Sequence, residues 1–397
     1  MLLVFKLGKA VTIPGIDTTL IKLSVSSNSF LNVMSMFSGG SLSSFSILAL
    51  GVGPYISSSI VVQLAAMVVP KLKELSQQGQ KGRAKINRIS RYFSLVVGVI
   101  QGFALIAMFE NNYHILNDSS TMGYIYAILC LLAGMSITMW ISDIITVYGL
   151  GNGVSIVIFI GAIGTLPLEF KTAYETFAAM NNGTLWFVLY CLMFVLIVIS
   201  IVLVETAERR IPIQQSNRVL SKTKGDFSYI PLKPNSSSVT PVIFASAFMT
   251  APAVILALFG VDTTKVSEVL SLTSVSGLII YSILIVLFTF FYSNLQVDVD
   301  TMCENFEKNG TYVPGVRPGD ETRKYVSKVL NSITCLGALF LVAICVLPNV
   351  IAMVTKMSST AALGGTGIII SVSVALDVYK NLKTMKQNSA YDNYRGF

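Results

Sequence analysis

Long apolar runs alternate with shorter polar connections along the whole chain. Each run covers about 17–25 residues, the length of an α-helix that crosses the hydrocarbon core of a bilayer. The runs lack the residue-by-residue alternation of apolar and polar positions that lipid-facing β-strands require. The pattern predicts membrane-spanning helices at roughly 52–70, 92–109, 121–142, 153–168, 185–204, 241–260, 276–295, 328–349 and 363–379.

A further, shorter apolar segment runs from Met1 to about Pro14 and carries Lys6 and Lys9. As a helix it would rise about 20 Å at 1.5 Å per residue, whereas the hydrocarbon core is roughly 30 Å thick. We expect a first helix that is truncated here and begins upstream of Met1. The alternative is a half-span that a partner completes.

The composition agrees with a membrane protein. Hydrophobic residues make up 53% of the 397 residues and charged residues only 12%, about half the charged share of a soluble globular protein. The chain is therefore predicted to be an all-α polytopic membrane protein.

Lysine and arginine gather in alternate connections, which places these connections on one side of the membrane. By the positive-inside rule that side is the cytoplasm, so the C-terminus is expected to be cytoplasmic. The net charge of +8 then reflects topology and a docking surface, and we expect no specific DNA binding. The basic connections lie within 71–91, 205–240, 296–327 and 380–395, and the opposite ones hold only Lys22, Lys171, Lys265 and Lys356.

Two of these connections are long: residues 205–240, here the first basic loop, and residues 296–327, the second basic loop. A carrier of small solutes has no obvious need for such platforms, whereas a channel that docks a large partner does. Coupled carriers also place ionisable groups near the membrane midplane. Here Asp143 and Asp377 fall near the predicted cytoplasmic ends of their helices.

Motifs for catalysis or metal binding are missing from the sequence. There is no HExxH, no GxxxxGK[ST], no acid pair within a span and no cysteine pair with zinc-ligand spacing. GLGNG at 149–153 follows a transmembrane helix rather than a strand, so we interpret it as a turn. The chain is predicted not to be an enzyme and to need no cofactor or metal.

Two features suggest a pore. Residues 30–51 are moderately apolar but interrupted by Gly39, Gly40 and several serines, which fits a short helix folded back into the protein; an ordinary outer loop is the alternative. Four stretches rich in small residues each carry an isoleucine just inside the membrane: 54–60, 151–161, 241–247 and 364–371. Small residues also serve close helix packing, but a ring of isoleucines would form a dewetting constriction.

At these residues the chain resembles the SecY family of protein-conducting channels, and the resemblance covers essentially the whole sequence. The matching motifs occur in order: PGID (14–17), MFSGG (36–40), SILALGVGPYISSSI (46–60), GRAKINRISRYF (82–93), GNGVSIVIF (151–159), ERRIPIQQSNR (208–218), PVIFAS (241–246), GTYVPGVRPG (310–319) and GGTGIIISVSVALD (364–377).

The resemblance implies ten helices in two inverted five-helix halves, residues 1–170 and 171–397, around a central pore. It implies a plug at about 33–45 that contains Met36, Phe37, Ser38, Gly39 and Gly40. The pore ring would consist of Ile56, Ile158, Ile243 and Ile370. A further ring position of the family falls on Ala162, which widens the ring locally or shifts the role to Ile160 or Ile163.

The implied function is that of a channel subunit in the bacterial cytoplasmic membrane. It would pass unfolded polypeptides and release transmembrane segments sideways into lipid between the second/third and seventh/eighth helices. SecE, SecG, SecA and the ribosome are the implied partners, and docking would use Arg209, Arg210, Lys222, Lys224 and Arg317. An accessory paralogue with dedicated substrates and a small-solute carrier are the alternatives.

Overall fold

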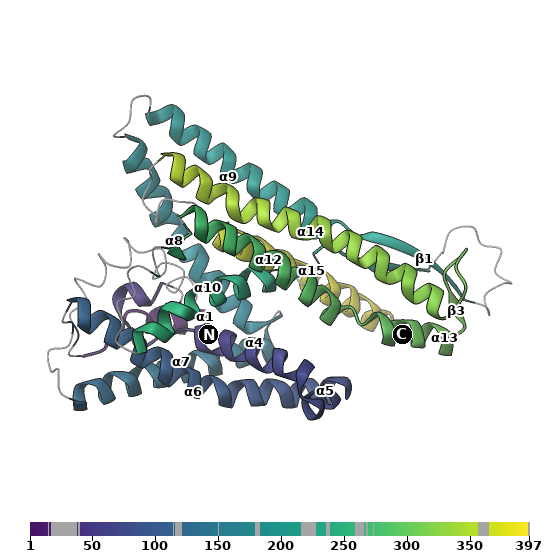
Figure 1. Ribbon diagram of the computed structural model, residues 1–397, viewed down its shortest axis with the longest axis horizontal. Coiled ribbons are helices and arrows are strands. Elements are labelled where there is room, and N and C mark those ends of the chain that lie inside the picture. The colour runs from purple at the N-terminus through teal and green to yellow at the C-terminus, as the bar shows by residue number, and fades with distance from the viewer. Residues whose placement is uncertain are drawn as a thin grey trace.

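The computed structural model is a bundle of long helices with a small β-sheet at one end (Figure 1). It describes residues 1–14, 16, 38, 40–113, 115, 121–149, 151–178, 183–215, 228–235, 239–258, 266, 269–272, 274–355 and 365–395. The helical fold predicted from the apolar runs is confirmed.

The elements follow the predicted apolar runs. The helices are α1 (Leu2–Gly8), the 3-10 helix η1 (Leu42–Ser44), α4 (Gly53–Val68), α5 (Pro70–Gln77), α6 (Gln80–Tyr113), α7 (Thr121–Tyr148), α8 (Gly153–Ala178), α9 (Gly183–Thr206), α10 (Thr240–Leu258), α12 (Val275–Gln296), α13 (Val299–Lys308), α14 (Asp320–Thr355) and α15 (Gly365–Arg395). Val69 separates α4 from α5 with extended backbone, because a residue that precedes proline is disfavoured in the helical region.

Six helical segments in the described chain are long and apolar enough to cross a membrane: Ala84–Glu110, Thr121–Tyr148, Gly153–Ala178, Gly183–Thr206, Val275–Lys308 and Asp320–Ile351. They coincide with six of the predicted spans. The other predicted spans correspond to α4, which has 16 residues, to α10 and to α15. The first segment forms α1, a helix of seven residues.

The two basic loops contain strands that the sequence pattern did not predict. Strand β1 (Arg209–Gln215) pairs antiparallel with β2 (Ser228–Leu232) in the first basic loop and with β3 (Thr311–Tyr312) in the second. Pro212 and Pro231, residues that ordinarily interrupt a strand, lie within β1 and β2. Strand β2 is an edge strand, and residues 209–213 of β1 pair with β2 alone, so each proline has one side without a described strand partner, where a missing N–H is tolerated. The order β2-β1-β3 therefore joins both loops in one sheet.

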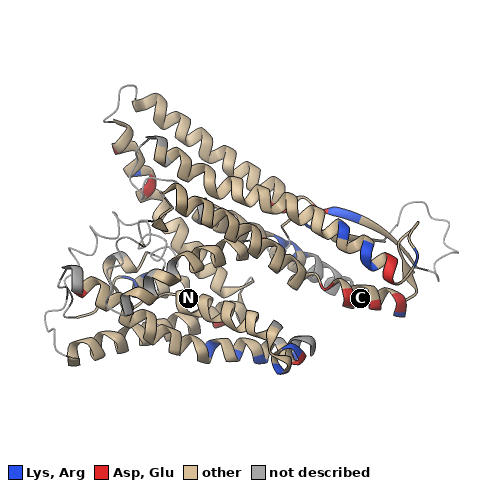
Figure 2. Ribbon diagram, viewed as in Figure 1, with Lys and Arg blue, Asp and Glu red and all other residues tan. Residues whose placement is uncertain are grey.

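The basic residues gather at one end of the bundle (Figure 2). This end holds α5 and the start of α6, the strand β1 and the start of α14 (Figures 1 and 2). Connections that are far apart in sequence thus lie on one side, as the charge pattern predicted.

Three clusters of buried apolar side chains hold the fold together. The largest joins α4, α8, α9, α10, α12, α14 and α15. The second packs residues 42–50 against α6 and α7, and the third, built on Ile211, Leu232 and Val313, lies under the sheet. Helix α8 packs on α7 and α15, and α10 packs on α6 and α12. These two helices therefore connect the α4–α7 group to the α12, α14 and α15 group.

Candidate pore constriction and docking loops

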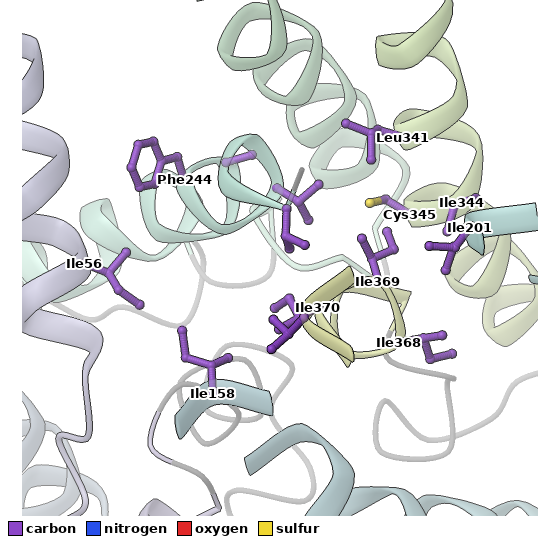
Figure 3. Packing of buried hydrophobic residues seen from close by; sticks show 14 of the residues in the cluster. Ile56, Ile158, Ile201, Phe244, Leu341, Ile344, Cys345, Ile368, Ile369 and Ile370 are labelled. Carbon is purple, nitrogen blue, oxygen red and sulfur yellow. The ribbon is translucent and has the colours of Figure 1, made fainter. Parts of the chain in front are cut away.

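The four isoleucines expected at the pore ring come from four helices and meet in the largest apolar cluster. Ile56 of α4, Ile158 of α8 and Ile370 of α15 are buried members of this cluster, and Ile243 of α10 packs against it. Figure 3 shows Ile56, Ile158 and Ile370 projecting from three helices toward the same interior region. The arrangement brings aliphatic side chains without hydrogen-bonding groups together at the centre of the bundle.

The fifth-helix position also has a defined environment. Ala162 is buried. Its side chain is a single methyl group, which is shorter than the isoleucine side chains of the expected ring. Of the two neighbouring isoleucines, Ile160 packs against the cluster, whereas 43% of Ile163 is exposed. Ile158 and Ala162 are four positions apart and share a face of α8, whereas Ile160 is two positions from each and lies on another face, so the structure assigns the role to neither isoleucine.

The described part of the expected plug region is anchored to the N-terminal segment. Ser38 is buried and its Oγ accepts a hydrogen bond from the Leu42 N–H at 3.1 Å. A β-bridge between Thr12 and Ser46 then ties residues 44–47 to the segment after α1. Gly40 has a left-handed φ of 75°, and Met36, Phe37 and Gly39 lie outside the described residues.

A hydrogen bond joins α4 and α12, the second and eighth of the predicted spans. We call the boundary between α4 and α6 on one side and α10 and α12 on the other the seam. The Tyr292 hydroxyl of α12 donates a hydrogen bond to Oε1 of Gln63 in α4 at 2.7 Å. The Gln63 amide in turn donates to the Ser59 hydroxyl at 2.9 Å, and Phe244 of α10 packs edge-on against Tyr292. No local sequence pattern points to this pair, because its partners lie 229 positions apart.

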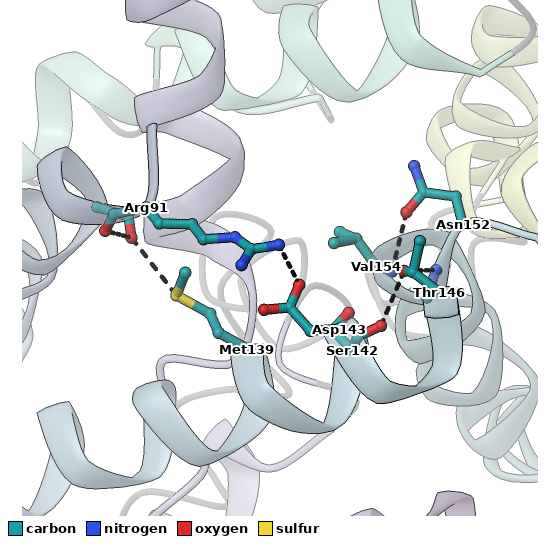
Figure 4. A network of polar contacts seen from close by, with 9 residues as sticks. Arg91, Met139, Ser142, Asp143, Thr146, Asn152 and Val154 are labelled. Carbon is teal, nitrogen blue, oxygen red and sulfur yellow. Dashed lines mark hydrogen bonds and ion pairs between the residues drawn. The ribbon is translucent and has the colours of Figure 1, made fainter. Parts of the chain in front are cut away.

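The GNG turn joins α7 to α8, as interpreted from the sequence (Figure 4). The Asn152 side chain accepts a hydrogen bond from the Val154 N–H at 3.0 Å and the Thr146 hydroxyl accepts one from the Gly153 N–H at 2.8 Å. A Cβ on Gly153 would lie 1.8 Å from the Ser142 carbonyl oxygen, so glycine is needed there. One turn away, Asp143 pairs with Arg91 of α6.

Two of the four arginines and lysines expected to dock a partner in the first basic loop lie on β1. Arg209 and Arg210 are exposed. The Arg210 guanidinium pairs with Glu208 at 2.7 Å and lies 4.7 Å above the Tyr229 ring. The hydrogen bond to Glu208 raises the pKa of Arg210, so the guanidinium stays protonated. Lys222 and Lys224 lie outside the described residues.

Arg317 lies on a tight turn of the second basic loop, beside this sheet. Its side chain is exposed, and its carbonyl accepts a hydrogen bond from the Thr322 hydroxyl at 2.8 Å. Gly315 and Gly319 adopt left-handed φ angles of 86° and 98°, which glycine allows without strain. Strand β3 precedes the turn and pairs with β1, so Arg317 and the two arginines of β1 belong to one structural unit.

Metal-ligating side chains are dispersed: in the described parts of the chain no three His, Cys, Asp or Glu residues cluster as a metal site would require.

These features define a polytopic helical membrane protein with an aliphatic centre and a basic sheet at one end. The SecY family model matches residues 46–379. The chain belongs to the SecY family.

Relatives and solved structures agree with this assignment. The protein translocase subunit SecY of Mycoplasma capricolum is 38% identical over 96% of this chain and 84% of its own length. That of Staphylococcus epidermidis is 36% identical over 100% of this chain and 94% of its own length.

A solved protein-conducting channel matches with a TM-score of 0.62 at 17% identity, over 97% of this chain and 90% of that one. Sec61 in a canine ribosome–channel complex matches with a TM-score of 0.60 at 16% identity, with the same coverage. At identities this low, the structural matches establish the fold alone. Family membership favours a protein-conducting channel over a small-solute carrier.

Proposed function

We propose that this chain is the protein-conducting channel subunit of a bacterial Sec translocase. Its substrates are unfolded polypeptides, which cross the membrane, and transmembrane segments, which leave sideways into lipid. The observation that carries the proposal is the meeting of Ile56, Ile158, Ile243 and Ile370 from four helices in one cluster, in a member of the SecY family.

An aliphatic ring suits a pore that must pass chains of any sequence. Its side chains offer no hydrogen bonds to ions or to a moving peptide, and a hydrophobic constriction stays dry when closed. The ring can deform around a passing chain because aliphatic contacts are individually weak and non-directional.

Sideways release requires the seam between α4/α6 and α10/α12 to part. The contacts across it are the hydrogen bond from Tyr292 to Gln63 and the packing of α10 on α6 and α4. A net worth of about 1 kcal/mol for one such hydrogen bond is small enough to be broken by an arriving segment. An apolar stretch of about 20 residues gains more by entering lipid. Residues 1–170 and 171–397 are proposed to move as two halves.

The basic sheet supports docking of a large partner on the cytoplasmic side. Arg209, Arg210 and Arg317 are exposed on one structural unit, and planar guanidinium groups recognise phosphate and carboxylate groups well. Lys222 and Lys224 would extend this surface. The proposed partners are SecA, which would supply work from ATP, or the ribosome, which would supply it through translation.

The remaining partners and the membrane orientation follow from the same proposal. SecE would hold the two halves together, and SecG would bind beside them. The basic loops and the C-terminus would face the cytoplasm of a bacterial cell. The chain itself would act as a conduit, with no catalytic step.

The test is affinity purification of the full chain from its native membrane, followed by reconstitution with an unfolded preprotein. We expect a small SecE-like helical protein to co-purify with SecA or ribosomes, and the preprotein to enter the vesicles. Gently solubilised, folded protein that captures none of these and transports no preprotein would overturn the proposal. Uptake of a small solute by that same protein would favour a carrier instead.

A further inference from the structure

A buried carboxylate lies where the first basic loop leaves the membrane helices. Glu205, in the last turn of α9, is only 6% exposed. Its Oε1 accepts hydrogen bonds from the Asn235 amide at 2.9 Å and from the Ser373 hydroxyl at 3.1 Å. Asn235 belongs to the end of the first basic loop and Ser373 to α15, so one carboxylate joins three parts of the chain.

One further contact holds the same loop end, and another joins α15 to α9. The Pro234 carbonyl oxygen approaches α14 so closely that a Cβ on Gly337 would lie 2.2 Å from it. The Lys380 ammonium of α15 donates a hydrogen bond to the Glu205 backbone carbonyl at 3.4 Å. Pro234 therefore packs against α14, and Asn235 is bound to α9, which is itself joined to α15.

The position of this network in the chain links the docking surface to the pore cluster. Strand β1 begins four residues after Glu205, and β2 ends three residues before Asn235. On the other side, Ser373 follows Ile370 by three residues, so both lie on one face of α15. Hydrogen bonds to a buried carboxylate are among the stronger ones. The Asn235 amide nitrogen and the Ser373 hydroxyl are both bound by Glu205, while the Asn235 Oδ1 is buried without a hydrogen-bond partner, so the carboxylate is the one described side-chain link between them.

We propose that Glu205 is a positioning residue that transmits displacement of the docking sheet to α15 and thereby to Ile370. The inference rests on the proposed function, since it presumes that a partner pushes on the sheet and that Ile370 lines the constriction. It assigns to Glu205, Asn235 and Ser373 a role in opening the pore that is separate from partner binding.

The test uses the full chain in membrane vesicles, with SecA as the motor and an unfolded preprotein as the substrate. In Glu205→Ala we expect SecA affinity within about two-fold of wild type but at least about a ten-fold loss of transported preprotein. Glu205→Gln keeps an acceptor oxygen and should recover most transport. Ser373→Ala, a milder change that removes one donor, should give an intermediate loss. Glu175→Ala is the matched control, because that side chain is 64% exposed.

A second variant separates coupling from a general loss of structure. Adding Ile370→Asn to Glu205→Ala loosens the constriction directly, so transport should rise again if the network acts by opening the pore. Normal transport by Glu205→Ala, an equal loss of SecA binding and transport, or no recovery in the double variant would each overturn the inference. Failure of the wild-type chain to bind either SecA or ribosomes and to transport preprotein with either would instead overturn the proposed function, and the coupling with it.

Discussion

At the scale of single residues, the buried Ile370 requires an apolar environment, whereas the exposed Arg317 requires contact with water or a charged group. Ile370 is 3% exposed and needs apolar neighbours. Arg317 is exposed on a turn that contains two glycines with left-handed φ angles, and we propose that it binds a partner outside the chain.

Ile370→Asn places an amide in the aliphatic cluster, where an unsatisfied polar group costs about 1–3 kcal/mol. Water then relieves that cost, so the closed constriction should hydrate. We expect increased ion leak through the resting channel, measured in planar bilayers, and export of substrates with defective signals. Ile370→Leu, which conserves volume, should stay tight. Unchanged leak and unchanged export in the asparagine variant would remove Ile370 from the ring.

Arg317→Glu reverses the charge at the tip of the turn without touching a buried contact. Partner-driven transport should fall by at least about ten-fold, while insertion and thermal stability stay at wild-type values. Arg317→Lys retains the charge but loses the planar donors, so it should show an intermediate transport rate. Transport at the wild-type rate in the glutamate variant would exclude docking at this residue.

At the scale of elements, close approaches between helices and loops decide which residues are replaceable. The carbonyl oxygen of Ile47 lies against α7 at Gly134, in the cluster that holds residues 42–50. Residues 42–45 are the end of the expected plug and Ile47 lies just beyond it, so we expect this contact to set where the plug region is attached.

Gly134→Ala would put a methyl group 1.9 Å from the Ile47 carbonyl oxygen. The backbone must shift, at a cost of about 1–3 kcal/mol for overpacking. We expect a lower melting temperature of the purified protein and a raised resting leak. Gly164→Ala in α8 is the control, since no heavy atom lies within 4 Å of its added methyl group. Equal stability of the two variants would show that residues 42–50 are not held by this contact.

How much the sequence predicts also differs between elements. Apolar runs predict the spanning helices well, because bilayer thickness fixes their length. The strands in the basic loops escape prediction because β1 pairs with β3, about a hundred residues away, and because Pro212 reads locally as a break. The four isoleucines were identified by motif resemblance, since composition says nothing about convergence. Glu205 reads as a helix end until Asn235 and Ser373 are brought beside it.

At the scale of the whole molecule, α4 and α6 meet α10 and α12 along the seam described above. The hydrogen bond from Tyr292 to Gln63 crosses it, and α10 packs against α6 and α4. Under the proposed function, the energy of this seam would set how apolar an arriving segment must be to open it.

Tyr292→Phe removes the donor and leaves the Gln63 oxygen without this partner, so the closed seam should weaken by about 1 kcal/mol. Segments of marginal hydrophobicity should then insert into lipid several-fold more often, as measured with a graded series of test segments. Tyr379→Phe is the control, because that ring is 63% exposed. An unchanged insertion threshold in Tyr292→Phe would mean that the seam opens elsewhere.

The pairing of β1 with β3 has a consequence for exchanging parts between relatives. Consider a chimera that takes only one basic loop from a relative in the SecY family. Its sheet would combine strands from two proteins, and the register in which Gln214 lies opposite Tyr312 would no longer be set by matched strands. Such a hybrid should misalign its arginines even when every one of them is present. Loop grafts should therefore succeed when residues 209–232 and 311–317 are transplanted together, as a single cassette.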